Sequence, residues 1–287
     1  MRGLMMDRQL LITSIMAFAE RNFPETGIVS IFAGGQVHRQ SYATSFRRSR
    51  QLANALTRVG MEPGDRVGTL AWNDHRHFET YYGVSCSGAV CHTINPRLFP
   101  EQIVYIVNHA ADRWILADPM FAPLLEALWP KLDSVEGVIF MAGEEGMPST
   151  SLPAAWCYET LIAAESDELD WPALDERTAS GLCYTSGTTG HPKGVLYDHR
   201  STLIHAYAAC MPDVIGLANR DTVLAVVPMF HANAWSLPYA CPMVGARIVL
   251  PGSLMGDPAV LADLIESEDV TVSMGVPTVW LGLLDSL

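Results

Sequence analysis

The 287-residue sequence lacks the short motifs that usually mark a metal site or a hydrolase. Its six cysteines form no C-x-x-C pair and no zinc-binding spacing, and its histidines show no H-E-x-x-H pattern. No serine lies in a G-x-S-x-G elbow, so a hydrolase triad has no nucleophile. Several cysteines lie in apolar runs, where a thiol acts as a small hydrophobe. These features favour a reducing compartment, and we expect a cytoplasmic protein.

Basic residues and long apolar runs are also scarce. Asp and Glu outnumber Lys and Arg by 31 to 18, and the formal net charge of −13 argues against a general nucleic-acid-binding protein. No apolar run approaches the length of a membrane span, and Asp7 and Arg8 interrupt any signal-peptide core near the N-terminus. With 49% apolar and 17% charged residues, the chain is typical of a globular protein, which we expect to be soluble.

The most informative stretch is 181–195, which reads GLCYTSGTTGHPKGV. Residues 181–184 predict a buried strand. The glycines that follow allow backbone N–H groups to approach an anion, the hydroxyls add rotatable donors, and a lysine adds positive charge. This combination predicts a polyphosphate-binding loop. Its candidate contacts are Thr185, Ser186, Gly187, Thr188, Thr189, Gly190 and Lys193.

The loop does not fit the Walker A pattern, in which lysine directly follows glycine. Here His191 and Pro192 separate Gly190 from Lys193, which disfavours an NTPase of that type. A flexible Ser/Thr/Gly surface loop is the structural alternative. The strand-like entry, the lysine and the density of hydroxyls argue against that alternative.

The segment YTSGTTGHPKG resembles the signature phosphate loop of the adenylate-forming (AMP-binding) enzymes: acyl-CoA synthetases, luciferases and peptide-synthetase adenylation domains. The resemblance implies that residues 185–190 and Lys193 hold the β- and γ-phosphates of ATP. It also implies that the Thr185 hydroxyl contacts a Mg²⁺ ion, which needs few protein ligands when it rides on ATP phosphates.

A second motif, PMFHANAW at 228–235, follows a predicted strand, where open α/β sheets place ligands. It is similar to the acyl-site motif of fatty-acyl-CoA synthetases. Carried over, His231 lies near the acyl carboxylate and the α-phosphate and is the catalytic candidate. The small Ala232 permits an aliphatic chain, and Trp235 gates the acyl tunnel. A structural role for His231 and plain core packing for Trp235 remain open.

Two further stretches extend the resemblance to bacterial long- and medium-chain synthetases. The turn Gly275-Val276-Pro277 is similar to a segment that lines the acyl pocket, although alone it is a strand-to-helix turn with proline at the helix start. The region around Arg97 and the opening residues 1–30 also match, and the N-terminal resemblance implies a homodimer.

Apolar spacing predicts an α/β fold with two parallel-sheet lobes and flanking helices. We expect a first lobe at 1–165, an acidic linker at 166–179 and a second lobe at 180–287, the last of these truncated. The expected strands are 28–32, 36–42, 66–72, 90–94, 114–117, 135–141, 181–184, 222–227, 246–250 and 270–274. The expected helices are 10–21, a helix capped by Thr44 or Ser45 that stops at Gly60, and 77–88, 101–110, 121–128, 161–164, 199–211, 233–243, 259–267 and 278–287.

The resemblance implies a ligase that converts a fatty acid to an acyl-adenylate with ATP and then to a thioester with coenzyme A. The family's adenine, ribose and catalytic-lysine contacts lie beyond residue 287, so we expect an N-terminal part that is inactive alone. Two alternatives stay open: adenylation of another carboxylate or for another acceptor, and a non-catalytic acyl- or nucleotide-binding dimerisation module.

Overall fold

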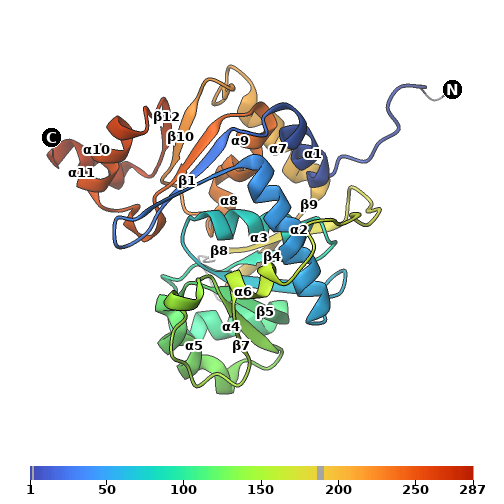
Figure 1. Ribbon diagram of the computed structural model, residues 1–287, viewed down its shortest axis with the longest axis vertical. Coiled ribbons are helices and arrows are strands. Elements are labelled where there is room, and N and C mark those ends of the chain that lie inside the picture. Colours follow the sequence, from blue (N-terminus) through green and yellow to red (C-terminus); the bar gives the residue numbers. More distant parts are fainter. Residues whose placement is uncertain (2, 186–190, 287) are drawn as a thin grey trace.

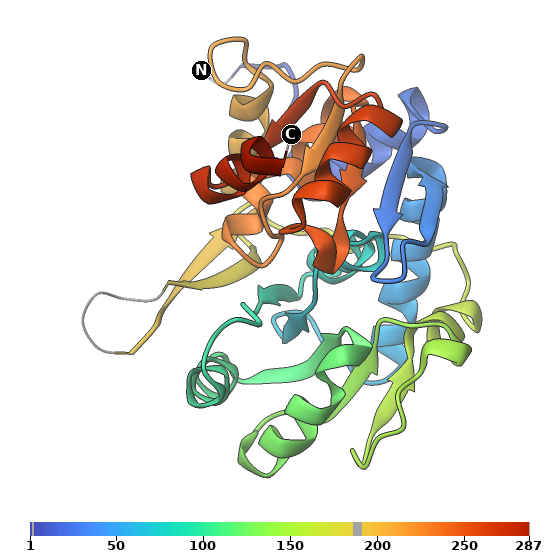
Figure 2. The same ribbon diagram turned by 90° about the vertical axis from the view of Figure 1, so that its left-hand side faces the viewer.

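The computed structural model describes residues 1, 3–185 and 191–286, and its strands form two sheets (Figures 1 and 2). A seven-stranded sheet has the order β7-β6-β5-β3-β4-β8-β9 and a five-stranded sheet the order β12-β10-β11-β1-β2. Only β2 and β9 run antiparallel to their neighbours among the described strands. The α/β fold class is therefore confirmed.

The strands of the seven-stranded sheet are β3 (Arg66–Leu70), β4 (Val90–Thr93), β5 (Asp112–Ala117), β6 (Gly137–Phe140), β7 (Ala155–Cys157), β8 (Ala179–Thr185) and β9 (Lys193–Asp198). Those of the five-stranded sheet are β1 (Gly27–Ile31), β2 (Val37–Ser41), β10 (Thr222–Ala225), β11 (Arg247–Leu250) and β12 (Val272–Met274). The helices are α1 (Ile12–Asn22), α2 (Tyr42–Arg58), α3 (His75–Ser85), α4 (Pro100–Ala110), α5 (Ala122–Leu128), α6 (Tyr158–Ala163), α7 (His199–Cys210), α8 (Ala232–Trp235), α9 (Leu237–Val244), α10 (Pro258–Ser267) and α11 (Pro277–Ser286).

Helices cover both faces of both sheets, and one layer of helices lies between the sheets. The central layer contains α1, α2, α3, α6, α7 and α9, and its core buries aromatic side chains such as Tyr42, Phe78 and Tyr239 against strands of both sheets. The outer face of the seven-stranded sheet carries α4 and α5, and that of the five-stranded sheet carries α10 and α11. The central helices therefore join the two sheets through one apolar core.

The two sheets do not divide the chain at the acidic segment 166–179. Strands β1 and β2 pair with β11 in the five-stranded sheet, although they come from the predicted first lobe. Strands β8 and β9 complete the seven-stranded sheet, although they come from the predicted second lobe. Periodicity reports which segments are strands, but it carries no information on which distant strands pair.

Three local expectations need correction. Helix α2 begins at Tyr42, because the Ser41 hydroxyl rather than that of Thr44 or Ser45 accepts the capping bond from the Thr44 N–H. Strand β9 begins at Lys193, inside the phosphate-loop motif, where a loop leading into a helix was expected. Before the predicted linker, β7 adds an edge strand that was not expected, and α6 begins at Tyr158, earlier than the expected 161.

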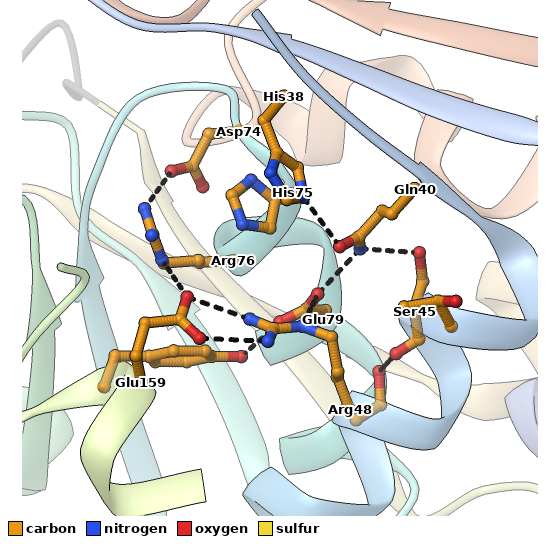
Figure 3. Close-up of polar contacts among 12 residues, drawn as sticks. His38, Gln40, Ser45, Arg48, Asp74, His75, Arg76, Glu79 and Glu159 are labelled. Carbon is orange, nitrogen blue, oxygen red and sulfur yellow. Dashed lines mark hydrogen bonds and ion pairs between the residues drawn. The ribbon is translucent and has the colours of Figure 1, made fainter. Parts of the chain in front are cut away.

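Helix α3 is anchored on one side by a buried charge network, here called the Glu79 network (Figure 3). The Glu79 carboxylate is fully buried and accepts hydrogen bonds from Gln40, Arg48 and Tyr158, each at 2.7 Å. Arg48 also forms a two-bond pair with Glu159 at 2.9 and 3.0 Å. Because these residues belong to β2, α2, α3 and α6, the network fixes α3 relative to three other elements.

Candidate functional site

The phosphate-loop motif joins two antiparallel strands and is not a strand-to-helix turn. In the β8–β9 pair, Thr185 lies opposite Lys193, and both side chains are exposed. The Thr185 hydroxyl lies 3.5 Å from the Lys193 carbonyl oxygen, at the long limit of a hydrogen bond. Figure 2 shows the hairpin extending away from the body of the molecule. The other predicted phosphate contacts, Ser186 to Gly190 in the sequence, lie outside the described residues.

Both flanks of the predicted loop contact helix α4. On the β8 side, the Tyr184 hydroxyl lies 2.6 Å from Nδ1 of His109, and burial raises the pKa of Tyr184 to about 12. On the β9 side, the His191 ring stacks on Tyr105 with ring centroids 4.5 Å apart. These two contacts were not predicted, because nothing in the local sequence of α4 points to a partner about 80 residues away.

The acyl-site motif is held in an unusual backbone conformation. Ala232, Asn233, Ala234, Trp235 and Ser236 all have positive φ, between 45° and 67°. Asparagine tolerates this region, but for other L-residues it costs about 1–2 kcal/mol each. The expected right-handed helix at 233–243 is therefore wrong at its start: α8 is a left-handed turn, and the right-handed helix α9 begins only at Leu237.

This left-handed turn contacts the strand that leads into the phosphate loop. The Asn233 side-chain oxygen lies 3.5 Å from the Cys183 sulfur of β8. On the other side of the turn, the Ser236 hydroxyl is hydrogen-bonded to Nδ1 of His205 in α7 at 2.5 Å. His231 and Trp235 are themselves exposed. The structure therefore brings the two predicted motifs together, although they are about 45 residues apart in the sequence.

The third predicted motif lies at the same edge of the five-stranded sheet as the second. Strand β12 pairs with β10, and the Val227 N–H donates to the Met274 carbonyl at 3.1 Å, so both motifs leave the carboxyl ends of neighbouring strands. The helix α11 starts at Pro277, one residue before the expected 278, and the Trp280 indole donates to the Gly275 carbonyl at 3.1 Å. Val276 is exposed.

Arg97 adds a cation beside the acyl-site motif that the sequence reading did not assign to the site. Its guanidinium carbon lies 5.6 Å from the centre of the Trp72 ring and 6.0 Å from that of Phe230, the residue before His231. These distances are those of cation–π contacts. Arg97 lies in the stretch that resembles bacterial synthetases, and that signal could have placed it here.

The described part of the chain contains neither a metal-binding cluster nor a membrane-spanning helix. Outside residues 2, 186–190 and 287, no group of three or more His, Cys, Asp or Glu side chains is arranged to hold a metal ion. In the same residues, every helix is too short or too polar to cross a membrane.

Comparison with known proteins identifies the family. Residues 18–287 match the AMP-binding enzyme family, and the chain belongs to that family. It is 49% identical over 284 residues to a 3-methylmercaptopropionyl-CoA ligase from Ruegeria lacuscaerulensis and, over the same length, to a medium-chain-fatty-acid–CoA ligase from Ectopseudomonas oleovorans. A long-chain-fatty-acid–CoA ligase from Thermus thermophilus is 46% identical over 283 residues.

These alignments cover 99% of this chain but only 50–52% of the three relatives. The chain therefore spans about half the length of the curated relatives it matches. Among solved structures, a long-chain-fatty-acid-CoA ligase from Archaeoglobus fulgidus superimposes with a TM-score of 0.85 at 22% identity. That superposition covers 97% of this chain and 54% of that one, and it supports the fold alone.

Proposed function

We propose that this chain is the N-terminal part of an ATP-dependent fatty acid–CoA ligase that forms AMP. The observation that carries the proposal is the contact between Cys183 in β8 and Asn233 in the left-handed turn, because it joins the predicted phosphate side to the predicted acyl side. The relatives that are named as fatty-acid–CoA ligases support this reaction class.

The proposed reaction has two steps. An oxygen of the fatty-acid carboxylate attacks the α-phosphorus of ATP, and pyrophosphate leaves to give an acyl-adenylate. The thiol sulfur of coenzyme A then attacks the acyl carbon, loses its proton and expels AMP. In the first step the protein positions the reactants and stabilises the charge on the departing phosphates. The second step needs residues that family members carry beyond the part matched here.

The residue roles follow the two motifs. Lys193 and residues 185–190 hold the β- and γ-phosphates, and the exposed Lys193 ammonium offsets their charge. The exposed Thr185 hydroxyl would help to hold a Mg²⁺ ion bound to the ATP phosphates, and that ion would supply further charge neutralisation. His231 orients the acyl carboxylate. Ala232, Trp235 and the turn Gly275-Val276-Pro277 border the acyl chain.

The acyl group of the proposed reaction is an aliphatic carboxylate. A medium- or long-chain fatty acid is our first choice, and the Ruegeria relative, named for a 3-methylmercaptopropionyl group, keeps a short thio-carboxylate as the second. An acceptor other than coenzyme A is the alternative within the family. The alternative that is not an enzyme is a non-catalytic acyl- or nucleotide-binding dimerisation module.

We also propose a cytoplasmic homodimer that forms through the N-terminal region. The first residues support the dimer, because Leu4, Met5 and Met6 are almost fully exposed and the N-terminal segment runs away from the body (Figure 1). An exposed apolar arm of this kind is typical of a segment that packs on another surface. Light scattering with and without residues 1–9 tests this assignment.

The test uses a protein of family length, made by joining residues 1–287 to the C-terminal half of the Ectopseudomonas relative. We expect pyrophosphate release that requires ATP, Mg²⁺ and a fatty acid, and none from the 287-residue chain alone. Lys193→Ala should lower kcat by about 100-fold or more, because it removes a charge that stabilises the departing phosphates. Lys131 is the only other lysine in the chain, and Lys131→Ala is the matched control.

Two results would count against the proposal. If the joined protein binds acyl chains but releases no pyrophosphate with any carboxylate tested, the binding-module alternative replaces the enzyme. If Lys193→Ala and Lys131→Ala behave alike in an active protein, the phosphate-loop assignment is wrong.

A further inference from the structure

The left-handed turn at 232–236 is not the conformation that its own sequence prefers. Alanine has the highest helix propensity of all residues, and two of the five residues are alanine. A right-handed backbone at 232–236 would keep these residues in their favoured region, although Pro238 in the first turn of α9 disfavours one continuous helix. Strained backbone of this kind persists only where the surroundings over-determine it, and such strain is concentrated at functional sites. The contacts that hold the turn therefore matter for function.

Asn73, in the loop after β3, holds the segment that enters the turn. Its side-chain amide donates to the carbonyl oxygens of Ala225 and Val227, both at 2.9 Å. Its side-chain oxygen accepts the Met229 N–H at 2.6 Å. Asn73 is fully buried, so none of these bonds competes with water. One side chain thus fixes three points of the path from β10 to the residue two before His231.

Tyr81, on helix α3, holds the same segment through a second set of contacts. Its hydroxyl donates to the Met229 carbonyl at 2.5 Å and lies 3.4 Å from the Asn233 side-chain oxygen inside the turn. Tyr81 is 1% exposed. Because α3 is itself anchored by the Glu79 network, Tyr81 is a fixed point against which the turn is set.

We propose that Asn73 and Tyr81 are positioning residues that keep the 232–236 turn left-handed and thereby set the directions of His231 and Trp235. This inference rests on the proposed function for its consequence, which is productive placement of the acyl carboxylate. Loss of either residue's bonds lets residues 232–236 relax toward the right-handed backbone region that L-residues favour. His231 then points elsewhere, while the flanks of the phosphate loop, which rest on α4 through Tyr184 and His191, keep their place.

The chain offers a closely matched pair of variants for the test. Tyr42 and Tyr81 are both buried, and each donates its hydroxyl to a backbone carbonyl at 2.5 Å, Ala246 in the first case and Met229 in the second. Tyr42→Phe and Tyr81→Phe therefore each remove one hydroxyl-to-carbonyl hydrogen bond and keep the aromatic ring. Only the second removes it from the segment that leads into the turn, together with the 3.4 Å contact to Asn233.

The first readout is ¹⁹F NMR of the 287-residue chain labelled with 5-fluorotryptophan, with Trp235→Phe to assign the Trp235 signal. We expect Tyr81→Phe to shift, split or broaden that signal, and Tyr42→Phe to leave it unchanged. Asn73→Asp, which keeps the acceptor for Met229 but loses both donors, should act as Tyr81→Phe does. An unchanged Trp235 signal in both site variants, or an equal change in Tyr42→Phe, overturns the inference.

The second readout is steady-state kinetics in the family-length protein. Tyr81→Phe should lower kcat for acyl activation by about 10-fold while the KM for ATP stays within about 2-fold, because transition-state alignment is lost and phosphate binding is kept. Equal losses in Tyr42→Phe would show a merely structural role. If the unmodified protein activates no carboxylate, the proposed function fails, and the NMR comparison still decides whether Asn73 and Tyr81 hold the turn.

Discussion

The two sides of the candidate site are built in different ways. The acyl side is held by buried hydrogen bonds: Asn73 is fully buried, Tyr81 nearly so, and both bond to backbone atoms beside His231. The phosphate side is a hairpin whose described flanks rest on α4 through Tyr184 with His109 and through His191 with Tyr105. Four successive residues of β9, 193–196, are exposed.

This difference matches what the two sides have to do in the proposed reaction. Placing a small carboxylate against a phosphorus atom demands fixed geometry, and buried, fully paired polar side chains provide it. A loop that admits ATP and releases pyrophosphate has to be reached from solvent, and the flanking residues 193–196 are exposed. Helix α3 connects the acyl side to the rest of the fold, because the Glu79 network fixes one face of this helix and Tyr81 projects from the other.

The largest effect should come from breaking the Glu79 network. Glu79→Gln removes the buried charge and replaces one acceptor oxygen with an NH2 group that faces other donors. The loss of a charge-assisted bond, about 1.5–3 kcal/mol, then adds to a buried donor left unpaired, about 1–3 kcal/mol. Urea unfolding of the 287-residue chain measures the loss. The control is Glu136→Gln, whose half-exposed carboxylate pairs with Arg113 and should contribute less than about 1 kcal/mol.

A similar loss of stability in Glu79→Gln and Glu136→Gln would show that the network does not anchor α3. The ¹⁹F signal of Trp235 adds a second reading. If α3 transmits the damage to the acyl side, Glu79→Gln disturbs that signal, whereas Glu136→Gln leaves it unchanged.

The next effect is a pH dependence of the folding stability that comes from His77, four residues after Asn73. His77 is fully buried; its Nδ1 lies 3.0 Å from the Trp72 carbonyl and its Nε2 2.9 Å from the Thr69 hydroxyl. Burial lowers the pKa of His77 to about 4. The unfolded chain takes up a proton near pH 6.5, so the stability contributed by neutral His77 is present above pH 6.5 and is lost as the pH falls toward 4.

Comparison of His77→Gln with the unmodified chain isolates this effect. The free-energy penalty of the substitution should shrink by about 3 kcal/mol between pH 7 and pH 4, because glutamine does not titrate. The comparison is needed because burial also raises the pKa of Asp118 to about 8, and that group stabilises the fold as the pH falls. A penalty that stays constant with pH would contradict the assigned protonation of His77.

Much of the fold was predictable because apolar periodicity is a local property. The strand 181–184, the hairpin around Gly34 and the helix 199–211 were found within a few residues of their observed bounds. The pairing of β1 with β11 was not predictable, since more than 200 residues separate the partners and neither carries a signal for the other. The acidic segment was read as a boundary, although the β8 strand that follows it joins the sheet of the first lobe.

The sequence predicted the motifs of the candidate site but not the backbone geometry that joins them. The residue types around Lys193 and His231 point to phosphate and acyl chemistry, and a family resemblance then assigned roles. The left-handed turn could not be predicted, because alanine at 232 and 234 favours a right-handed helix and the opposing contacts come from Asn73 and Tyr81, more than 150 residues earlier. The error at the start of the 233–243 helix therefore has the same physical origin as the positioning role proposed above.

The smallest effect should appear on the phosphate side. Tyr184→Phe removes one hydrogen bond to His109 at the surface, and the free energy of unfolding should fall by about 1 kcal/mol or less. Hydrogen exchange should report it locally, as faster exchange of the β9 amides at 193–196. Tyr197→Phe is the control, because that β9 tyrosine makes no side-chain hydrogen bond within the described residues. Equal exchange in the two variants would mean that α4 does not hold the hairpin, and that the two sides of the site differ even more than the contacts suggest.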